Sequence, residues 1–467
     1  MRKHERACEV SPACVEPLET RTLMAADMVL EWNNIALETT KTLPGPQIVP
    51  PRQLRILAMV HGAVFDAVNS VERGHEPYLI KVGTPRWASA EAAAAVAAHD
   101  VLVGLVPPRQ AEYDAALEAS LANIPDGSAE DAGAAVGRAV AAAMLEARLG
   151  DGSDVPAPYA PGTGPEAWQP TPPGFAPALL PQFATVTPFA IDSPSQFRAP
   201  PPPSITSDPF TAAFDEVKAI GAVGSTTRTA EQTNIARYWA GPLGTIQPPG
   251  QWNRIARTVA TAERNSLAQN ARLFALLNFG MCDGIIASWD TKYTYNFVRP
   301  VTAIRNAASD GNPDTDADTA WTPLLGTPGH PSYASAHSTI SSAAATLLAD
   351  FFGSDAIAFQ DTAEVTAGGA TITRSFDGFR EAAEEAGASR IYGGIHWSFD
   401  NQAGLQAGRS VGEFVADNLL RPRGNAGHDG DHPGGVAAPE GALGSALPSR
   451  SDADVFFSDA AVDDLLE

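Results

Sequence analysis

The chain has 467 residues, 44% of them hydrophobic and 18% charged, a composition that excludes a disordered chain and predicts a folded protein with a sizeable core. Its 54 acidic and 31 basic residues give a net charge of -23, which opposes binding to nucleic acid or to an anionic membrane surface, so any bound anion needs a local cluster of positive side chains. No uninterrupted run of about 18 apolar residues is present, and we therefore expect no membrane span.

The first 27 residues are predicted to lie outside the fold. They are charged and polar and lack the apolar run of a secretory signal. Residues 15–27, VEPLETRTLMAAD, resemble a short export motif of planctomycete exoproteins, in which acidic-x-Arg-x-Leu is followed by Ala. We therefore expect residues 1–27 to be an export-type or disordered segment and the mature protein to be extracytoplasmic, either secreted or periplasmic.

Residues 28 to about 150 are predicted to be helical. Apolar residues recur there at three- and four-residue spacing in alanine-rich segments, which cover residues 54–71, 91–106, 111–124 and 128–150. His61 shares an apolar face with Leu57 and Val64, and His99 lies among alanines. Both histidines are interpreted as core or second-layer residues and not as ligands.

Residues 151–209 change in character, because 16 of the chain's 39 prolines lie here without a clear period. Spaced aromatic residues favour a long ordered loop that is draped over the domain rather than a linker.

The remaining chain, residues 210–422, is predicted to be helical again and to carry the functional site. Helical patterns cover residues 208–221, 235–241, 252–289, 336–352, 379–394 and 401–420. Strand signals are scarce, so the predicted fold class is all-α. Residues 423–467 are predicted to be a disordered acidic tail. His428 and His432 lie in this tail with metal-like spacing, but solvated side chains are the favoured interpretation.

The stretch HPSYASAHSTISSAAATLLADFFG, residues 330–353, places Ser335 and His337 at the mouth of a helix. The simpler interpretation is an N-cap by Ser335 or Ser338. The alternative is an anion site, since a helix N-terminus offers unpaired N–H groups and a partial positive charge.

Two short stretches supply the positive groups that an anion would need. DTKYTYNFVRP contains Lys292 and, seven residues later, Arg299, whereas ASRIYGGIHWSFD contains Arg390 and, six residues later, His396. For either stretch taken singly, solvated helix charges are the favoured interpretation. Ser335, Ala336 and His337 lie between the two stretches in the chain. The three motifs together form a pattern that chance rarely assembles.

This three-part pattern resembles the signature of the superfamily that unites vanadium-dependent haloperoxidases with bacterial acid phosphatases and type 2 phosphatidic acid phosphatases. Segments such as WNNIAL, EQTNIARYWAG and ARLFALLNFGMCDGIIASWD are similar to the bacterial haloperoxidase branch, so the resemblance covers roughly residues 28–422. It implies one large helical domain built around two four-helix bundles, with the site in the core of one of them.

The chemistry of the residues fits an oxyanion. Lys292, Arg299 and Arg390 would neutralise it, and Ser335 Oγ with the N–H of Ala336 would bind further oxygens. The resemblance implies His396 as the covalent vanadium ligand, His337 as the acid–base group and a catalytic role for Lys292 toward bound peroxide. The sequence departs from the family's Pro-Ser-Gly-His at Ala334 and Ala336.

The resemblance implies two candidate activities, and a third, non-catalytic function stays open beside them. The favoured one is a vanadate-dependent peroxidase that oxidises halide with hydrogen peroxide to hypohalous acid, with a small organic molecule as a further candidate partner. The second is an acid phosphatase that acts through a phosphohistidine. The third is a non-catalytic exoprotein that binds an anion. The sequence leaves the oligomeric state open.

Three further residues are site candidates. Asp283 and Asp290, seven residues apart before Lys292, are predicted either to orient the cage arginines or to be solvated. His330 stands where relatives similar to bromoperoxidases carry histidine and those similar to fungal chloroperoxidases carry phenylalanine, which favours bromide or iodide over chloride. The alternative is that His330 only shapes the loop between Gly329 and Pro331.

Overall fold

A computed structural model describes residues 27–43, 49–366 and 368–423 of the chain. The predicted all-α class is confirmed, since helices and a single two-stranded hairpin make up the regular structure of these residues. Most of the predicted export segment and acidic tail, including His428 and His432, lies outside the described residues.

The α-helices follow the predicted periodic segments closely. They are α1 (Met28–Lys41), α2 (Pro50–Glu72), α3 (Ala90–Leu105), α4 (Gln110–Leu121), α5 (Ser128–Ala147), α6 (Asp208–Ile220), α7 (Ala230–Tyr238), α8 (Gln247–Ala262), α9 (Leu267–Tyr295), α10 (Pro300–Asn306), α11 (Ala336–Phe352), α12 (Phe379–Tyr392) and α13 (Ser398–Asn418). The single pattern predicted over residues 252–289 is two helices, because Ser266 and Gln269 form a capping box that starts α9.

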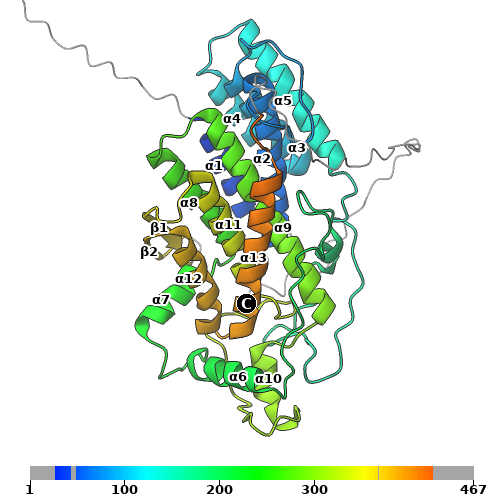
Figure 1. Cartoon of the computed structure of the whole chain (residues 1–467), viewed down its shortest axis with the longest axis vertical. Helices are drawn as coiled ribbons and strands as arrows, with labels where there is room; N and C mark the ends of the chain where they lie inside the picture. The colour runs from blue at the N-terminus through cyan, green and yellow to red at the C-terminus, as the bar shows by residue number, and fades with distance from the viewer. Residues whose placement is uncertain (1–26, 44–48, 367, 424–467) are drawn as a thin grey trace, which may run out of the picture.

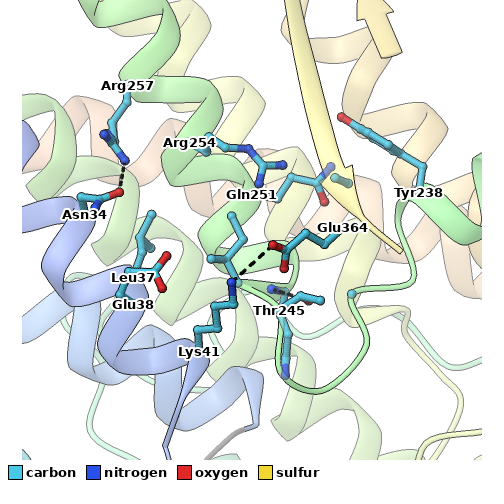
Figure 2. Close-up of a pocket in the computed structure, with 14 residues that line it drawn as sticks. Asn34, Leu37, Glu38, Lys41, Tyr238, Thr245, Gln251, Arg254, Arg257 and Glu364 are labelled. Carbon is cyan, nitrogen blue, oxygen red and sulfur yellow. Dashed lines mark hydrogen bonds and ion pairs between the residues drawn. The ribbon is translucent and has the colours of Figure 1, made fainter. Parts of the chain in front are cut away.

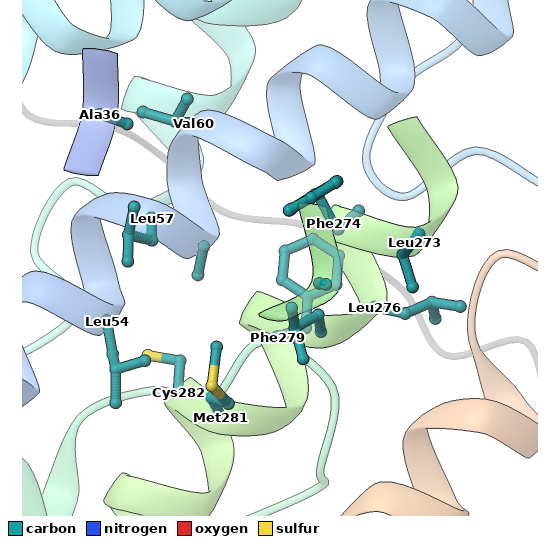
Figure 3. Packing of buried hydrophobic residues seen from close by; sticks show 14 of the residues in the cluster. Ala36, Leu54, Leu57, Val60, Leu273, Phe274, Leu276, Phe279, Met281 and Cys282 are labelled. Atoms are coloured by element: carbon teal, nitrogen blue, oxygen red, sulfur yellow. The ribbon is translucent and has the colours of Figure 1, made fainter. Parts of the chain in front are cut away.

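The helices form two groups that meet at α9. In the first, α2 packs against α3, α5 and α9, and Figure 1 shows α3, α4 and α5 together at one end of the molecule. Figure 3 shows the apolar core between α2 and α9, where Leu57 and Phe279 are buried. Burial of side chains of this size contributes roughly 1.5–3 kcal/mol each.

The second group consists of α9, α11, α12 and α13, and it contains the candidate site. Helix α11 packs against α9, α12 and α13 (Figure 1). The approach of α13 to α11 depends on Gly408, because a Cβ atom there would lie 2.1 Å from the backbone oxygen of Thr339. This close packing fixes the start of α11 beside the start of α13.

The hairpin of β1 (Phe359–Glu364) and β2 (Thr371–Phe376) was not predicted from the sequence. The strands are antiparallel, with Phe359 opposite Phe376. In β1 buried and exposed residues alternate, and its buried Asp361 accepts hydrogen bonds from Arg254 and Tyr238. A six-residue strand with a buried carboxylate lacks the apolar alternation by which strands are recognised.

The Pro-rich stretch 151–209 is an ordered loop, as predicted. Its only helices are a short 3-10 turn, Pro181–Thr185, and the first residues of α6. Trp168 and Phe183 of this loop are fully buried, and the backbone N–H of Trp168 donates to the backbone oxygen of Asn296 at 2.8 Å. The loop therefore covers the C-terminal end of α9.

Two described helices, α2 and α9, reach a mean hydropathy of 1.3 and are long enough to cross a membrane by length and composition alone. In both, 94% of the apolar window is buried inside the protein, as in core helices.

Candidate active site

Lys292 lies in the last turn of α9, and its ammonium group points into the second helix group. The helix ends at Asn296, which adopts a left-handed φ of 49°. Lys292 is fully buried, and its Nζ donates to the backbone oxygens of Pro331 at 2.9 Å and Ser332 at 2.8 Å. The lysine therefore ties α9 to the segment that precedes α11.

Arg299 immediately precedes α10 and joins the other two sequence motifs. Its Nε donates to the backbone oxygen of His330 at 2.8 Å, and one terminal nitrogen lies 2.9 Å from His330 Nδ1. The other terminal nitrogen donates to the backbone oxygen of Ile395 at 2.7 Å and lies 3.1 Å from His396 Nε2. This fully buried arginine thus connects His330 with His396.

The start of α11 supplies the residues of the middle motif. Ser335 is the N-cap and accepts from the N–H of Ser338 at 3.3 Å, so the N-cap interpretation is confirmed, and the anion site stays a prediction. Ala336 is the first helical residue and does not have a positive φ, so alanine is accommodated where the family pattern has glycine. His337 follows it, with a hydrogen bond to the backbone of Trp239. Its Nε2 is buried and has no partner among the described residues.

His396 lies just before α13 and is oriented by Asp400, a residue that the sequence analysis missed. The Nδ1 atom lies 2.7 Å from Asp400 Oδ2, which also accepts hydrogen bonds from Ser332 Oγ and from the N–H of Trp397 at 3.2 Å. Because a carboxylate accepts, Nδ1 carries the proton and Nε2 presents its lone pair to Arg299. The four-residue spacing at a helix start was the available signal for this pair.

Arg390 lies in the last turn of α12 and is 2% exposed. Its Nε donates to Ser389 Oγ at 2.9 Å, and a terminal nitrogen donates to the backbone oxygen of Ala236 at 3.3 Å. These neutral partners leave its charge without compensation.

We call Lys292, Arg299 and Arg390 the cationic cage. Within the described residues none of the three forms an ion pair with a carboxylate. Burial, followed by repulsion from Arg299, lowers the pKa of Arg390 to about 9 and that of Lys292 well below its usual value. Burial also lowers the pKa of Arg299 to about 10, although Asp400 opposes this shift. Buried charges are normally paired, so the cage fits a bound anion.

The three histidines of the site are neutral. Burial is the main cause that lowers the pKa of His330, His337 and His396 well below the usual value, and the cage charges lower it further. Neutral imidazoles retain a nitrogen lone pair, so His396 Nε2 can bind or attack an electrophilic centre. His337 Nε2 can accept and return a proton.

A cavity of about 630 Å³ opens onto these residues. His330, Ala336, His337, Arg390 and His396 contribute to its lining, whereas Lys292 and Ser335 do not line it, and Arg299 contacts it only through His330 and His396. His330 is therefore part of the site and not only of its loop, and its ring lies 4.9 Å from that of Trp289.

A second pocket, of about 120 Å³, lies between α1, α8 and β1 (Figure 2). Unlike the cationic cage, it contains positive side chains that are paired with carboxylates. Its Lys41 pairs with Glu364 at 3.3 Å, and its Arg254 pairs with Asp361 at 2.6 Å. Charges balanced in this way do not require an added anion.

The prediction that Asp283 and Asp290 orient the cage arginines is wrong. Asp283 accepts the N–H groups of Phe189, Ala190 and Ile191 at 2.6–2.9 Å. Asp290 binds Arg198 through two hydrogen bonds of 2.6 and 2.7 Å. Both carboxylates face the Pro-rich loop, so they hold this loop against α9.

The chain is similar to several known proteins. Residues 272–424 match the family model of the VCPO second helical-bundle domain. The vanadium chloroperoxidase of Curvularia inaequalis is 27% identical over 505 residues, which cover 84% of this chain and 81% of that protein. A bacterial vanadium-dependent iodoperoxidase structure has a TM-score of 0.73 and 26% identity and covers 85% of this chain and 98% of its own. A holo-type bacterial vanadium-dependent chloroperoxidase shares the fold, with a TM-score of 0.67, 19% identity and coverage of 83% and 96%.

Proposed function

The chain belongs to the vanadium-dependent haloperoxidase family, and from this premise we propose that it oxidises bromide or iodide with hydrogen peroxide at the cationic cage. The observation that carries the proposal is the burial of Lys292, Arg299 and Arg390 without carboxylate partners around His396, whose Nε2 lies 3.1 Å from a terminal nitrogen of Arg299. Vanadate is the cofactor, and its charge and several oxygens match these donors.

Bound vanadate would supply a Lewis-acidic centre that activates hydrogen peroxide without a change in its own oxidation state. His396 Nε2 would hold the metal, and Asp400 keeps this nitrogen unprotonated by binding Nδ1–H. The two arginines and Lys292 would bind the oxygens, with Ser335 Oγ and the N–H of Ala336 at the start of α11. Lys292 would also polarise bound peroxide.

His337 is the proton-transfer residue of the proposal. Its Nε2 has no partner among the described residues, and the imidazole lines the cavity from which peroxide arrives. It would take a proton from hydrogen peroxide and return it to the oxygen that leaves as water. The balanced reaction consumes hydrogen peroxide, halide and one proton and yields hypohalous acid and water.

The preference for bromide or iodide is proposed from the contact between His330 and Arg299. A terminal nitrogen of Arg299 lies 2.9 Å from His330 Nδ1, so one charged donor is shared with a neutral imidazole and is less available to an anion. A cage that polarises peroxide less strongly favours the halides that are easier to oxidise. The iodoperoxidase name of a structural neighbour supports this preference.

The test is to incubate purified protein with orthovanadate and to follow triiodide formation from iodide and hydrogen peroxide. Hydrolysis of 4-nitrophenyl phosphate is measured in parallel without vanadate. Vanadate-dependent triiodide formation without ester hydrolysis supports the proposal. Ester hydrolysis alone would instead identify a phosphatase. The absence of both reactions would indicate a non-catalytic anion-binding protein.

We also propose an extracytoplasmic location, for which the N-terminal segment is the only support. The division into an export segment, a helical domain of residues 28–422 and an acidic tail stays a prediction.

A further inference from the structure

The cavity above the cage is larger and more apolar than its proposed small substrates need. Its walls are formed largely by aliphatic and aromatic side chains, among them Leu179, Leu243, Ile285, Trp289, Leu325 and Ile340. Its volume of about 630 Å³ lies in the range of pockets that enclose an organic ligand, typically about 300–1,000 Å³. Halide and hydrogen peroxide are small and hydrated, so apolar walls give them no binding energy.

The charged side chains that line this cavity, Arg237 and Arg390, are both positive. Arg237, near the end of α7, lines it, is exposed, and forms no side-chain hydrogen bond or ion pair within the part of the chain that the structure describes. Arg390 also lines the cavity, but the proposed vanadate site uses its charge, so Arg237 is the lining cation left for a second ligand. A cation would be repelled from this cavity, whereas a molecule that carries an acidic oxygen would be attracted.

Leu243 contributes an apolar surface at the same cavity. It belongs to the segment between α7 and α8 and is 65% exposed. Its neighbours Pro242 and Pro248 also line the cavity, so this segment presents one apolar edge. Arg237 and Leu243 together offer a charge and an apolar surface to one ligand.

We propose that this cavity binds an aromatic organic acid and that this acid is the halogen acceptor; this inference rests on the proposed haloperoxidase function. Its acidic oxygen pairs with Arg237, and its ring lies against the apolar walls and Trp289. A ring carbon attacks the halogen of hypohalous acid formed at the cage. The carbon–halogen bond forms, the oxygen–halogen bond breaks with its electron pair moving to oxygen, and the ring proton converts that hydroxide to water.

The test uses 6-hydroxy-2-naphthoate and its methyl ester at equal concentrations, with vanadate-loaded protein, bromide and hydrogen peroxide. The ratio of brominated acid to brominated ester is compared with the ratio that added hypobromous acid gives at the same pH. We expect the enzyme to enrich the brominated acid at least about threefold. Arg237→Gln and Leu243→Asp should return the ratio toward that of the reagent. The matched substitutions Arg138→Gln and Leu149→Asp, at exposed positions that do not line the cavity, should preserve it.

A binding measurement separates this inference from the proposed function. Titration calorimetry with 6-hydroxy-2-naphthoate in the presence of vanadate should detect binding that Arg237→Gln weakens about two- to fivefold, as expected for a solvent-accessible ion pair. Triiodide formation combined with a reagent-like product ratio would overturn the acceptor site and leave the peroxidase intact. Without triiodide formation the peroxidase proposal fails, and calorimetry still decides whether the cavity binds the acid: absence of binding overturns the site.

Discussion

The Nδ1 atom of His396 lies 2.7 Å from Oδ2 of Asp400, and the same carboxylate oxygen accepts a hydrogen bond from Ser332 Oγ. The backbone oxygen of Asp400 accepts the N–H of Ser335 at 3.0 Å, so this residue also positions the N-cap of α11. Asp400 therefore joins the second and third sequence motifs and fixes the tautomer of the proposed vanadium ligand. Residues that orient a metal-ligating histidine in this way commonly contribute 10- to 100-fold to metal affinity, to order of magnitude.

Asp400→Asn should weaken vanadate binding by roughly 10- to 100-fold, because a neutral amide stabilises Nδ1–H less than a carboxylate does. Equilibrium dialysis with vanadium analysis measures the dissociation constant. Asp417→Asn, at an exposed position of the same helix, is the control and should bind as the wild type does. Equal affinity in Asp400→Asn and wild type would remove Asp400 from the site.

His396→Ala should abolish vanadium retention while the fold stays intact. Its imidazole is the proposed metal ligand, whereas the helix packing around it depends on apolar contacts of other residues. Circular dichroism reports the fold, and vanadium analysis after gel filtration reports retention. Vanadium bound at the wild-type stoichiometry would contradict the assignment of His396 as the ligand.

Arg390→Met should weaken vanadate binding roughly 10- to 100-fold, since a charged donor contributes about 1.5–3 kcal/mol. The melting temperature of the vanadate-free variant should not fall, because methionine relieves the repulsion between buried cations. An arginine with a purely structural role would lower the melting temperature instead. Measuring both quantities on one protein sample therefore distinguishes the two roles.

The pH dependence of stability tests whether His337 is neutral in the fold. Burial lowers the pKa of His337, so the unfolded chain binds a proton near pH 6.5 that the folded protein does not bind, and stability decreases on acidification. His337→Gln removes this contribution. Relative to wild type, the variant should gain up to about 1.4 kcal/mol per pH unit below pH 6.5, as measured by urea unfolding without vanadate.

His99 provides a control with the opposite sign. Hydrogen bonds to Asp100 and Asp114 raise the pKa of His99, so its stabilisation is present at low pH and is lost as the pH rises through that pKa. His99→Gln should therefore lose stability relative to wild type on acidification. A loss of relative stability on acidification in His337→Gln, as in His99→Gln, would contradict a neutral His337.

The sequence contained most of the candidate site because each motif is short and lies at the end of a helix. Lys292 and Arg299 are separated only by the end of α9, and Arg390 and His396 by the end of α12. The members of each pair are therefore close in the sequence as well as in space, and their spacing could be recognised from the sequence. The partners of Asp283 and Asp290 could not be predicted in this way. They belong to an aperiodic loop about 90 residues away, whose path depends on tertiary packing.

His330→Phe should increase the ratio of chloride to bromide oxidation, and it is the most direct test of halide choice. In the wild-type protein one terminal nitrogen of Arg299 contacts His330 Nδ1 at 2.9 Å, and a phenylalanine ring cannot accept that hydrogen bond. The freed charged donor would then be available to the bound anion, and its contribution of about 1.5 kcal/mol corresponds to a change of roughly tenfold. The aromatic contact with Trp289, with ring centroids 4.9 Å apart, should persist and preserve the shape of the cavity. Steady-state rates with chloride, bromide and iodide at one pH measure the ratio. Equal chloride and bromide turnover in the wild type would contradict the proposed preference, and an unchanged profile in the variant would limit His330 to a structural role.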